Sequence, residues 1–391
     1  MEKQKAIIYP FDLEFCPIVR HRNLLEEYEI IDLVAPRGFG ITGVDVGFAD
    51  GGTEIGMIVK DDFFKSLEKC NVVIFADSQY YEGIEEDIYQ KMKITIQQKK
   101  NIVSTLEVVD NIKNELESLC LENNTYIKFI NNLAFEMTPP LYKKTNIYGL
   151  NANKYKSNSN QHEKISKIET AIIFVMGITE RTNKFEIQLA LREKFLELGY
   201  RVSQIGSKNC CELMGFHSFP KFMSATNLSE VEKIVMFNKF VKKIETEESP
   251  ELIIIGIPGG TMKVSNNYTN KFGIFAYEIS EAVEPDFAIL STFYEDFIPE
   301  YFEKLSNSSK YRFGFEIDCF NMANVQLNWT ETVLLKNDVY VKLDSEFINQ
   351  KLKKYEKADL SIFNIFYDSH VDQIVEIAVN KLSSYAEIEL I

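Results

Sequence analysis

The chain has 391 residues, of which 45% are hydrophobic, so it is long enough for two or three domains and is not disordered overall. Lys and Arg number 43 against 58 Asp and Glu, which gives a formal net charge of −15. An acidic surface of this size repels phosphate backbones, which argues against nucleic-acid binding and is compatible with a basic partner.

The N-terminal segment and the cysteines favour a cytoplasmic protein. "MEKQKAIIYPFD" has neither a long apolar core nor a cleavage-site pattern, so we expect no secretory signal. No apolar run reaches the length of about 18 residues that a membrane-spanning helix needs. The six cysteines are spread along the chain without a CxxC pair, which argues against a disulfide framework and a zinc site. We therefore expect a reducing cytoplasm, no membrane and no metal.

The first 150 residues alternate short apolar runs with amphipathic ones. Predicted strands, rich in Ile and Val, span residues 5–9, 29–34, 54–59, 71–76 and 101–108, and predicted helices span residues 61–70 and 85–100. Strands and helices in alternation predict a mostly parallel sheet with helices on its faces. We therefore predict a Rossmann-like α/β domain over residues 1–150.

A polar segment then divides the chain. Residues 151–168 are rich in Asn, Ser and Lys and cannot bury enough apolar surface to order themselves, so they predict a linker. The alternation restarts after it, with predicted strands at 170–176, 200–206, 251–257 and 286–291 and predicted helices at 184–198, 229–245 and 369–385. Residues 332–343 alternate around Lys-Asn-Asp and predict a β-hairpin. Residues 169–391 are therefore predicted to form a second, P-loop-like α/β domain.

"FVMGITERTNKF", residues 174–185, has the layout of a phosphate-binding loop, because a strand leads into Gly177 and Lys184 begins a helix. In such a loop successive backbone N–H groups converge on phosphate oxygens and the lysine adds charge. Two positions depart from the usual pattern. Asn183 replaces the glycine before the lysine and takes space that a phosphate oxygen needs, and Phe185 replaces the Ser or Thr that ligates Mg²⁺.

The helix that follows this loop has an apolar stripe. Ile187, Leu191, Phe195 and Leu198 recur on one face, and Gly199 stands where a helix end favours a left-handed residue.

We predict nucleotide or anion binding by Gly177, Thr179, Arg181, Thr182, Asn183 and Lys184. Three interpretations stay open: Mg²⁺-dependent nucleotide hydrolysis, anion binding without hydrolysis, and a surface lysine on an inherited scaffold. Hydrolysis is disfavoured because "ELIIIGIPGG" ends in glycines where a metal-orienting acid is expected, and Asp286 lies at the wrong end of its strand. Gly259 and Gly260 fit a turn facing the loop or a plain tight turn. We expect no cofactor; ATP or GTP with Mg²⁺ is the alternative.

The segment after the first predicted strand, "FDLEFCPIVRHRN", carries four further candidate ligand-binding residues: Asp12, His21, Arg22 and Asn23. In α/β proteins this position usually presents a ligand-binding loop. His21 and Arg22 are suited to a carboxylate or phosphate. A capped, solvated helix is the interpretation that we favour.

The densest glycine segment, residues 36–56, carries the candidate ligand-binding residues Asp45, Asp50, Gly51 and Gly52. Glycines let the backbone approach a ligand or turn tightly. "GFGITG" fits the dinucleotide pattern GxGxxG, but no helix clearly begins there, so a structured turn is favoured over a ligand loop.

The seven-residue spacing from Gly177 to Lys184 resembles the loop of dethiobiotin synthetases and of a family of two-domain proteins. In the latter a Rossmann-like N-terminal domain precedes a P-loop C-terminal domain. The whole chain resembles a family of peptide maturation system proteins, through "IIYPFD", "VRHRN", "GVDVGFADGG", "FVMGITERTNKFEIQLALREKFLELGYRVSQIGS" and "ELIIIGIPGG".

Proteins of that family are accessory proteins encoded beside radical-SAM enzymes that modify ribosomally made peptides. The resemblance therefore implies a non-catalytic role, with the precursor peptide or the radical-SAM maturase as partner. The alternative is a nucleotide-dependent ligase or transferase that uses the Lys184 loop. By analogy with other two-domain α/β proteins, we expect a homodimer.

Overall fold

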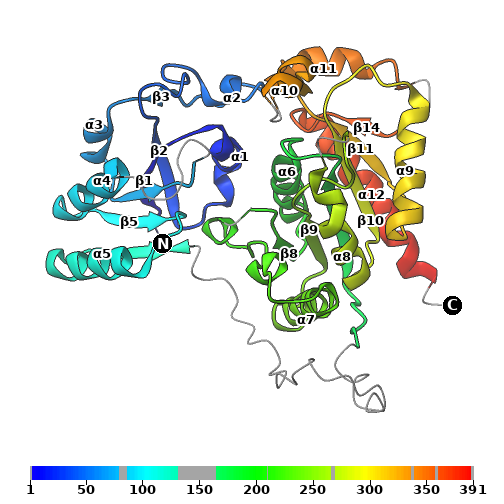
Figure 1. Ribbon diagram of the computed structural model, residues 1–391, viewed down its shortest axis with the longest axis horizontal. Helices are drawn as coiled ribbons and strands as arrows, with labels where there is room; N and C mark the ends of the chain where they lie inside the picture. Colours follow the sequence, from blue (N-terminus) through cyan, green and yellow to red (C-terminus); the bar gives the residue numbers. More distant parts are fainter. Residues whose placement is uncertain are drawn as a thin grey trace.

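The computed structural model describes residues 2–78, 86–130, 164–208, 210–265, 269–335, 339–356 and 360–388. The described chain forms two α/β units, each built on a six-stranded parallel sheet (Figure 1). The predicted fold class is thereby confirmed. Most of the predicted linker and the boundary at residue 150 lie outside the described residues, so the domain limits stay predictions. We call the two units the N-terminal and the C-terminal domain.

The N-terminal sheet has the strand order β3-β2-β1-β4-β5-β6, which is the order of the Rossmann fold. Its strands are β1 (Gln4–Tyr9), β2 (Tyr28–Val34), β3 (Val59–Lys60), β4 (Val72–Phe75), β5 (Asn101–Ser104) and β6 (Ile127–Phe129). Its helices are α1 (Cys16–Arg20), α2 (Val46–Ala49), α3 (Phe63–Leu67), α4 (Glu86–Gln97) and α5 (Asp110–Asn123). Hydrophobic clusters cover both faces of the sheet, which is why its strands read as apolar runs.

The third predicted strand, residues 54–59, is mostly wrong, because only Val59 and Lys60 pair with β2. The backbone N–H groups of Ile55, Gly56 and Met57 donate instead to the Asp45 carboxylate. A backbone donor used in this way is not available to a neighbouring strand.

The C-terminal sheet has the order β14-β11-β10-β7-β9-β8. Its strands are β7 (Ala171–Gly177), β8 (Val202–Ile205), β9 (Leu252–Gly256), β10 (Phe287–Thr292), β11 (Cys319–Met322) and β14 (Ile362–Phe363). Its helices are α6 (Lys184–Glu197), α7 (Glu230–Glu248), α8 (Ile274–Ala282), α9 (Pro299–Phe313), α10 (Trp329–Leu335), α11 (Ser345–Leu352) and α12 (Asp368–Ile388). The chain leaves β7 towards β8 on one side and later returns to β10 on the other. The carboxyl ends of β7 and β10 therefore form a topological switch point, the usual place for a ligand.

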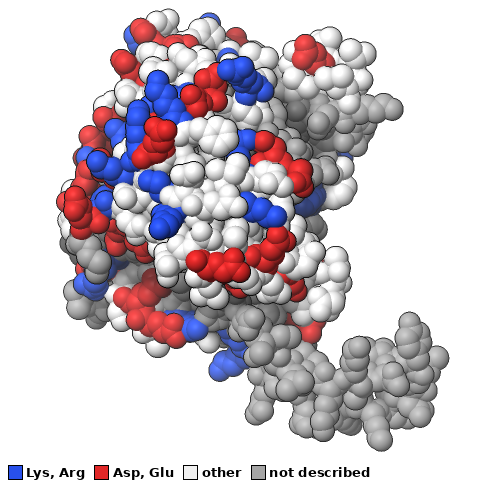
Figure 2. Space-filling model, turned by 90° about the vertical axis from the view of Figure 1, so that its left-hand side faces the viewer, with Lys and Arg blue, Asp and Glu red and all other residues white. Residues whose placement is uncertain are grey.

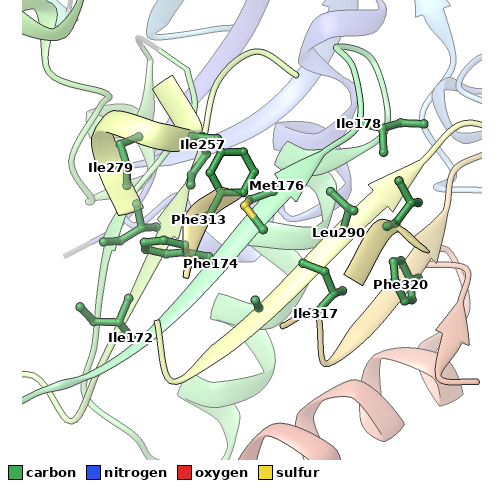
Figure 3. Close-up of a cluster of buried hydrophobic side chains, with 14 of the residues drawn as sticks. Ile172, Phe174, Met176, Ile178, Ile257, Ile279, Leu290, Phe313, Ile317 and Phe320 are labelled. Carbon is green, nitrogen blue, oxygen red and sulfur yellow. The ribbon is translucent and has the colours of Figure 1, made fainter. Parts of the chain in front are cut away.

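Helices cover both faces of this sheet. On one face Phe174 and Met176 of β7 and Leu290 of β10 point into a large core closed by α7, α8 and α9 (Figure 3). On the other face Ile173 and Val175 of β7 pack against α6 and α12. Two apolar layers explain why β7 is almost continuously hydrophobic.

Helix α6 is buried on two sides because it lies between the domains. Its predicted apolar stripe contacts the sheet through Ile187, Leu191 and Phe195. Leu198, predicted on the same stripe, is instead 55% exposed, because it follows the last helical residue. On the opposite side, Phe185 and Leu189 enter the hydrophobic cluster of the N-terminal domain.

The predicted β-hairpin over residues 332–343 is wrong. Trp329–Leu335 is helical as α10, and β13 (Tyr340–Lys342) pairs antiparallel with β12 (Val325–Leu327). The side chain of Asn328 accepts a hydrogen bond from the Glu331 N–H, which is the arrangement that starts a helix. The predicted turn, residues 336–338, lies outside the described residues.

The surface carries charges of both signs. On the face shown in Figure 2, basic and acidic side chains are interspersed and do not gather into one basic patch. Within the described ranges, no helix has both the length and the apolar character needed to cross a membrane.

Candidate functional site between the two domains

The loop between β7 and α6 is tied to the end of β10. The Ile178 N–H donates to the Ser291 carbonyl, and the Ser291 hydroxyl donates to the Thr182 carbonyl. Arg181 and Asn183 both have a φ of 57°, in the left-handed region that Asn tolerates better than most residues. These contacts hold the loop at the switch point of the sheet.

Gly177 has a steric role in this loop. A Cβ atom at this position would lie 2.9 Å from Cδ of Lys184 and 2.8 Å from the carbonyl oxygen of Thr179, and it would clash with the Thr182 hydroxyl. Glycine therefore lets the lysine stem pass directly over the end of β7.

Lys184 is buried at the bottom of the loop, with 5% of its surface exposed. Its ammonium donates to the Gly259 carbonyl and lies 3.2 Å from Glu180 Oε2. Burial lowers the pKa of Lys184, and Glu180 acts against this shift. A Cβ atom on Gly260 would lie 2.6 Å from the Ile178 carbonyl, so the glycine turn after β9 does face the loop.

A cavity of about 490 Å³, which we call the loop cavity, opens in front of Lys184 between the domains. Its charged lining residues are Arg181, Lys184, Lys208, Lys342, Glu14, Asp50, Glu180 and Glu186. Two ion pairs cross it: Lys208 to Glu14 at 2.5 Å, and Lys342 to Asp50 at 2.6 Å. The cavity therefore offers cations whose charges are balanced by carboxylates of the same chain.

Sequence reasoning missed five of the charged lining residues: Glu14, Glu180, Glu186, Lys208 and Lys342. Lys208 follows the carboxyl end of β8, so the rule that parallel strands end at the ligand edge could have found it. Glu14 lies in "FDLEFCPIVRHRN", the same segment as the predicted ligand-binding residues Asp12 and His21. Lys342 has no local signal, because its partner Asp50 lies 292 positions away in the sequence.

The two departures from the phosphate-loop pattern have different surroundings. Asn183 Oδ1 is buried and accepts no hydrogen bond from the described residues, although Asn183 lines the loop cavity. Phe185 is 5% exposed. It packs with Phe15 and Phe216 in the hydrophobic cluster of the N-terminal domain, which residues of both domains form. The position that usually provides a hydroxyl for Mg²⁺ thus holds the domains together. Asp286 lies at the opposite edge, where its carboxylate accepts from the N–H of Ile172.

The predicted ligand-binding side chains of the segment after β1 make contacts within the chain. They are Asp12, His21, Arg22 and Asn23. Asp12 caps the 3₁₀ turn Leu13–Phe15 and accepts a hydrogen bond from the Ser78 hydroxyl at 2.6 Å. The guanidinium of Arg22 donates to a main-chain carbonyl of α1. The amide of Asn23 donates to Glu193 of α6 at 3.2 Å.

His21 joins the domains through two carboxylates of α6. Its Nδ1 lies 2.6 Å from Glu193 Oε2, and its Nε2 lies 2.9 Å from Glu186 Oε1. Burial opposes protonation of the ring, but the charges and hydrogen bonds of these glutamates raise the pKa of His21 to about 9. The acidic group that His21 was predicted to bind is therefore supplied by the chain itself.

Arg20 completes this buried charge cluster. Its Nε lies 2.9 Å from Glu186 Oε1, and its guanidinium stacks at 4.6 Å over the Phe366 ring. Burial alone would raise the pKa of Glu186, but Arg20 and His21 outweigh it and lower the pKa. The hydrogen bond with His21 lowers the pKa of Glu193 as well, so both carboxylates of α6 are held ionised at the interface.

Asp45 organises the glycine-rich segment. Its carboxylate accepts from the N–H groups of Gly47, Ile55, Gly56 and Met57, at 2.8–3.0 Å. Burial raises its pKa, but these hydrogen bonds outweigh that effect and lower the pKa. The GxGxxG match, residues 38–43, follows β2 and not β1, and no helix begins within it. Asp45 thus holds a structured turn.

Asp50, Gly51 and Gly52 contact the C-terminal domain. Burial raises the pKa of Asp50, and Lys342 acts against this shift. A Cβ atom on Gly51 would lie 2.6 Å from the Leu343 carbonyl, and one on Gly52 would lie 3.0 Å from Cδ1 of Phe366. These glycines permit the close approach of the two domains.

No grouping of three or more His, Cys, Asp or Glu side chains suited to a metal ion occurs in the part of the chain that the structure describes. All six cysteines are buried and free of disulfides. His217, near the Cys210–Cys211 pair in sequence, lies 2.5 Å from Glu248 instead.

Comparison with known proteins identifies the fold. No protein-family model and no curated protein matches the sequence. A solved DUF1611 family protein from Anabaena variabilis has a TM-score of 0.60 at 12% identity, over 97% of this chain and 100% of that one. This match covers both domains in the same order and shows a shared fold.

Weaker matches cover a third of the chain. An amine dehydrogenase from Mycobacterium smegmatis has a TM-score of 0.26 at 19% identity, over 32% of this chain and 38% of that one. A homoserine dehydrogenase from S. aureus has a TM-score of 0.27 at 12% identity, over 34% of this chain and 33% of that one.

Proposed function

We propose that this protein is an accessory in the maturation of a ribosomally synthesised peptide, and that it binds the precursor peptide or its radical-SAM maturase without hydrolysing nucleotide. The observation that carries the proposal is the position of Phe185. Phosphate loops that use Mg²⁺ present a hydroxyl directly after the lysine, whereas Phe185 is buried between the domains. The identity of the partner rests on the sequence resemblance.

The loop cavity supports a binding role. An ammonium carries three N–H donors, and Lys184 uses two of them on Gly259 and Glu180. The Glu180 side chain is 57% exposed, so a carboxylate or phosphate of a partner can take its place beside Lys184. Such an exchange needs no metal ion.

A nucleotide-dependent ligase or transferase is the second candidate. It is favoured by the close fit of Gly177 around Lys184 and by a cavity of about 490 Å³, within the range of small-molecule sites. ATP or GTP with Mg²⁺ would then be the cofactor.

Calorimetric titration with ATP, GTP and pyrophosphate, each with and without Mg²⁺, separates these candidates. We expect pyrophosphate to bind without Mg²⁺, and Mg²⁺ not to tighten binding of either nucleotide. Lys184→Ala is expected to weaken pyrophosphate binding about tenfold, because one charge-assisted hydrogen-bond donor is lost. Lys304→Ala, an exposed lysine on α9, is the matched control and should bind as the wild type does.

A pull-down with any precursor peptide and radical-SAM maturase encoded beside this chain tests the partner. Retention of either one by the tagged protein is the expected result. Mg²⁺-dependent ATP or GTP turnover that Lys184→Ala abolishes, together with no retained partner, would establish the enzyme instead.

A further inference from the structure

A second cavity, of about 430 Å³, lies between the domains and shares Glu186 with the loop cavity. We call it the acidic cavity, because its lining includes Glu54, Glu186, Glu193, Glu197, Asp368 and Asp372. The lining also includes four basic side chains: Arg20, His21, Arg22 and Lys194. Acidic groups therefore outnumber basic ones, so the cavity favours a cation.

The Glu186 carboxylate, which lines both cavities, has one oxygen without a donor. Oε1 of Glu186 contacts Arg20 and His21, each at 2.9 Å. Oε2 of the same carboxylate is buried and has no hydrogen-bond partner among the described residues, and Glu186 as a whole is 1% exposed. A buried oxygen left without a donor is costly, which points to a donor that a ligand brings.

The rim has unpaired charge as well. The Lys194 ammonium forms ion pairs with Asp372 Oδ1 at 2.5 Å and with Glu197 Oε2 at 3.7 Å. Glu54 and Asp368 have no ion pair with any described residue. Two free carboxylates therefore remain at the mouth.

The cavity also has an apolar side. Ile55 comes from the glycine-rich segment, Ala190 from α6 and Val371 from α12. An aliphatic stem can lie on these side chains while a charged head stays among the carboxylates. The Phe366 ring in this lining is covered by the chain's own Arg20 guanidinium.

We infer that the acidic cavity binds the side chain of a lysine or arginine of the partner peptide. Its apolar side suits the methylene stem, and its unpaired carboxylates suit the cationic head. The net charge of −15 attracts such a peptide at long range. The inference rests on the proposed function only in taking a peptide as the occupant.

Titration with two small probes tests this site in the full-length protein. Nα-acetyl-arginine amide is expected to bind saturably, and Nα-acetyl-citrulline amide, of nearly the same shape but uncharged, about tenfold more weakly. The double variant Glu54→Gln/Asp368→Asn is expected to weaken the arginine probe about fivefold, as two exposed ion pairs are lost. Added salt should weaken binding further.

The double variant Glu300→Gln/Glu303→Gln is the matched control. It removes two exposed carboxylates from α9, outside the cavity, and should keep wild-type affinity. Equal binding of the two probes, or unchanged affinity in Glu54→Gln/Asp368→Asn, would overturn the inference. If the arginine probe fails while pyrophosphate binding and partner retention persist, the proposed function stands and only this inference falls.

Discussion

Phe185→Ala is expected to lower the free energy of unfolding by about 3–5 kcal/mol, the usual range for truncating a buried phenylalanine. The side chain is 5% exposed and packs with residues of both domains. The Lys208 ammonium also lies 5.6 Å from the centre of its ring. The loss should therefore loosen the contact between the domains as well as α6 itself.

Denaturant unfolding followed by circular dichroism measures this effect. Leu196→Ala is the matched control on the same helix, because Leu196 is 40% exposed, and it should cost less than about 1 kcal/mol. A Phe185→Ser variant that kept full stability and gained Mg²⁺-dependent nucleotide binding would show that Phe185 is not an interface anchor.

The second prediction concerns the dependence of stability on pH. The pKa of His21 rises from 6.5 to about 9 on folding, which corresponds to roughly 3 kcal/mol at most. The folded chain holds this proton more tightly than the unfolded chain does. The contribution is therefore fully present below pH 6.5 and is lost as the pH rises to about 9.

His21→Gln removes the titrating group. Unfolding midpoints at several pH values should show a variant that is less stable than wild type at pH 6 and changes little between pH 6.5 and 9. Glu186 and Glu193 titrate below this window, because the pKa values of both are lowered. Wild type, measured in the same buffers, is the control. If the stability of His21→Gln fell with pH as steeply as that of wild type, the role assigned to His21 would be contradicted.

Much of the fold could be predicted because burial leaves a local pattern. β4 and β9 read as apolar runs, since a parallel sheet covered on both faces buries every side chain. Gly177 and Lys184 were recognisable for another reason, since one loop brings them together over seven positions. The errors also have local causes. Asp45 accepts hydrogen bonds from backbone N–H groups of the predicted third strand, so these groups do not pair with β2. Asn328 caps a helix in the segment where alternating residues predicted a β-hairpin.

The candidate site depends on contacts that no local pattern records. Residues 21 and 193 are 172 positions apart, and Asp50 and Lys342 are 292 positions apart. The sequence around His21 would be the same whether its side chain contacted a ligand or a glutamate of its own chain. Phe185 likewise marks a missing hydroxyl in the loop motif, but its use in joining the domains follows only from the packed chain. Periodicity and spacing predict the secondary structure of a segment, because that structure depends on neighbouring residues. The partner of a charged side chain depends instead on which distant segments the tertiary structure brings together.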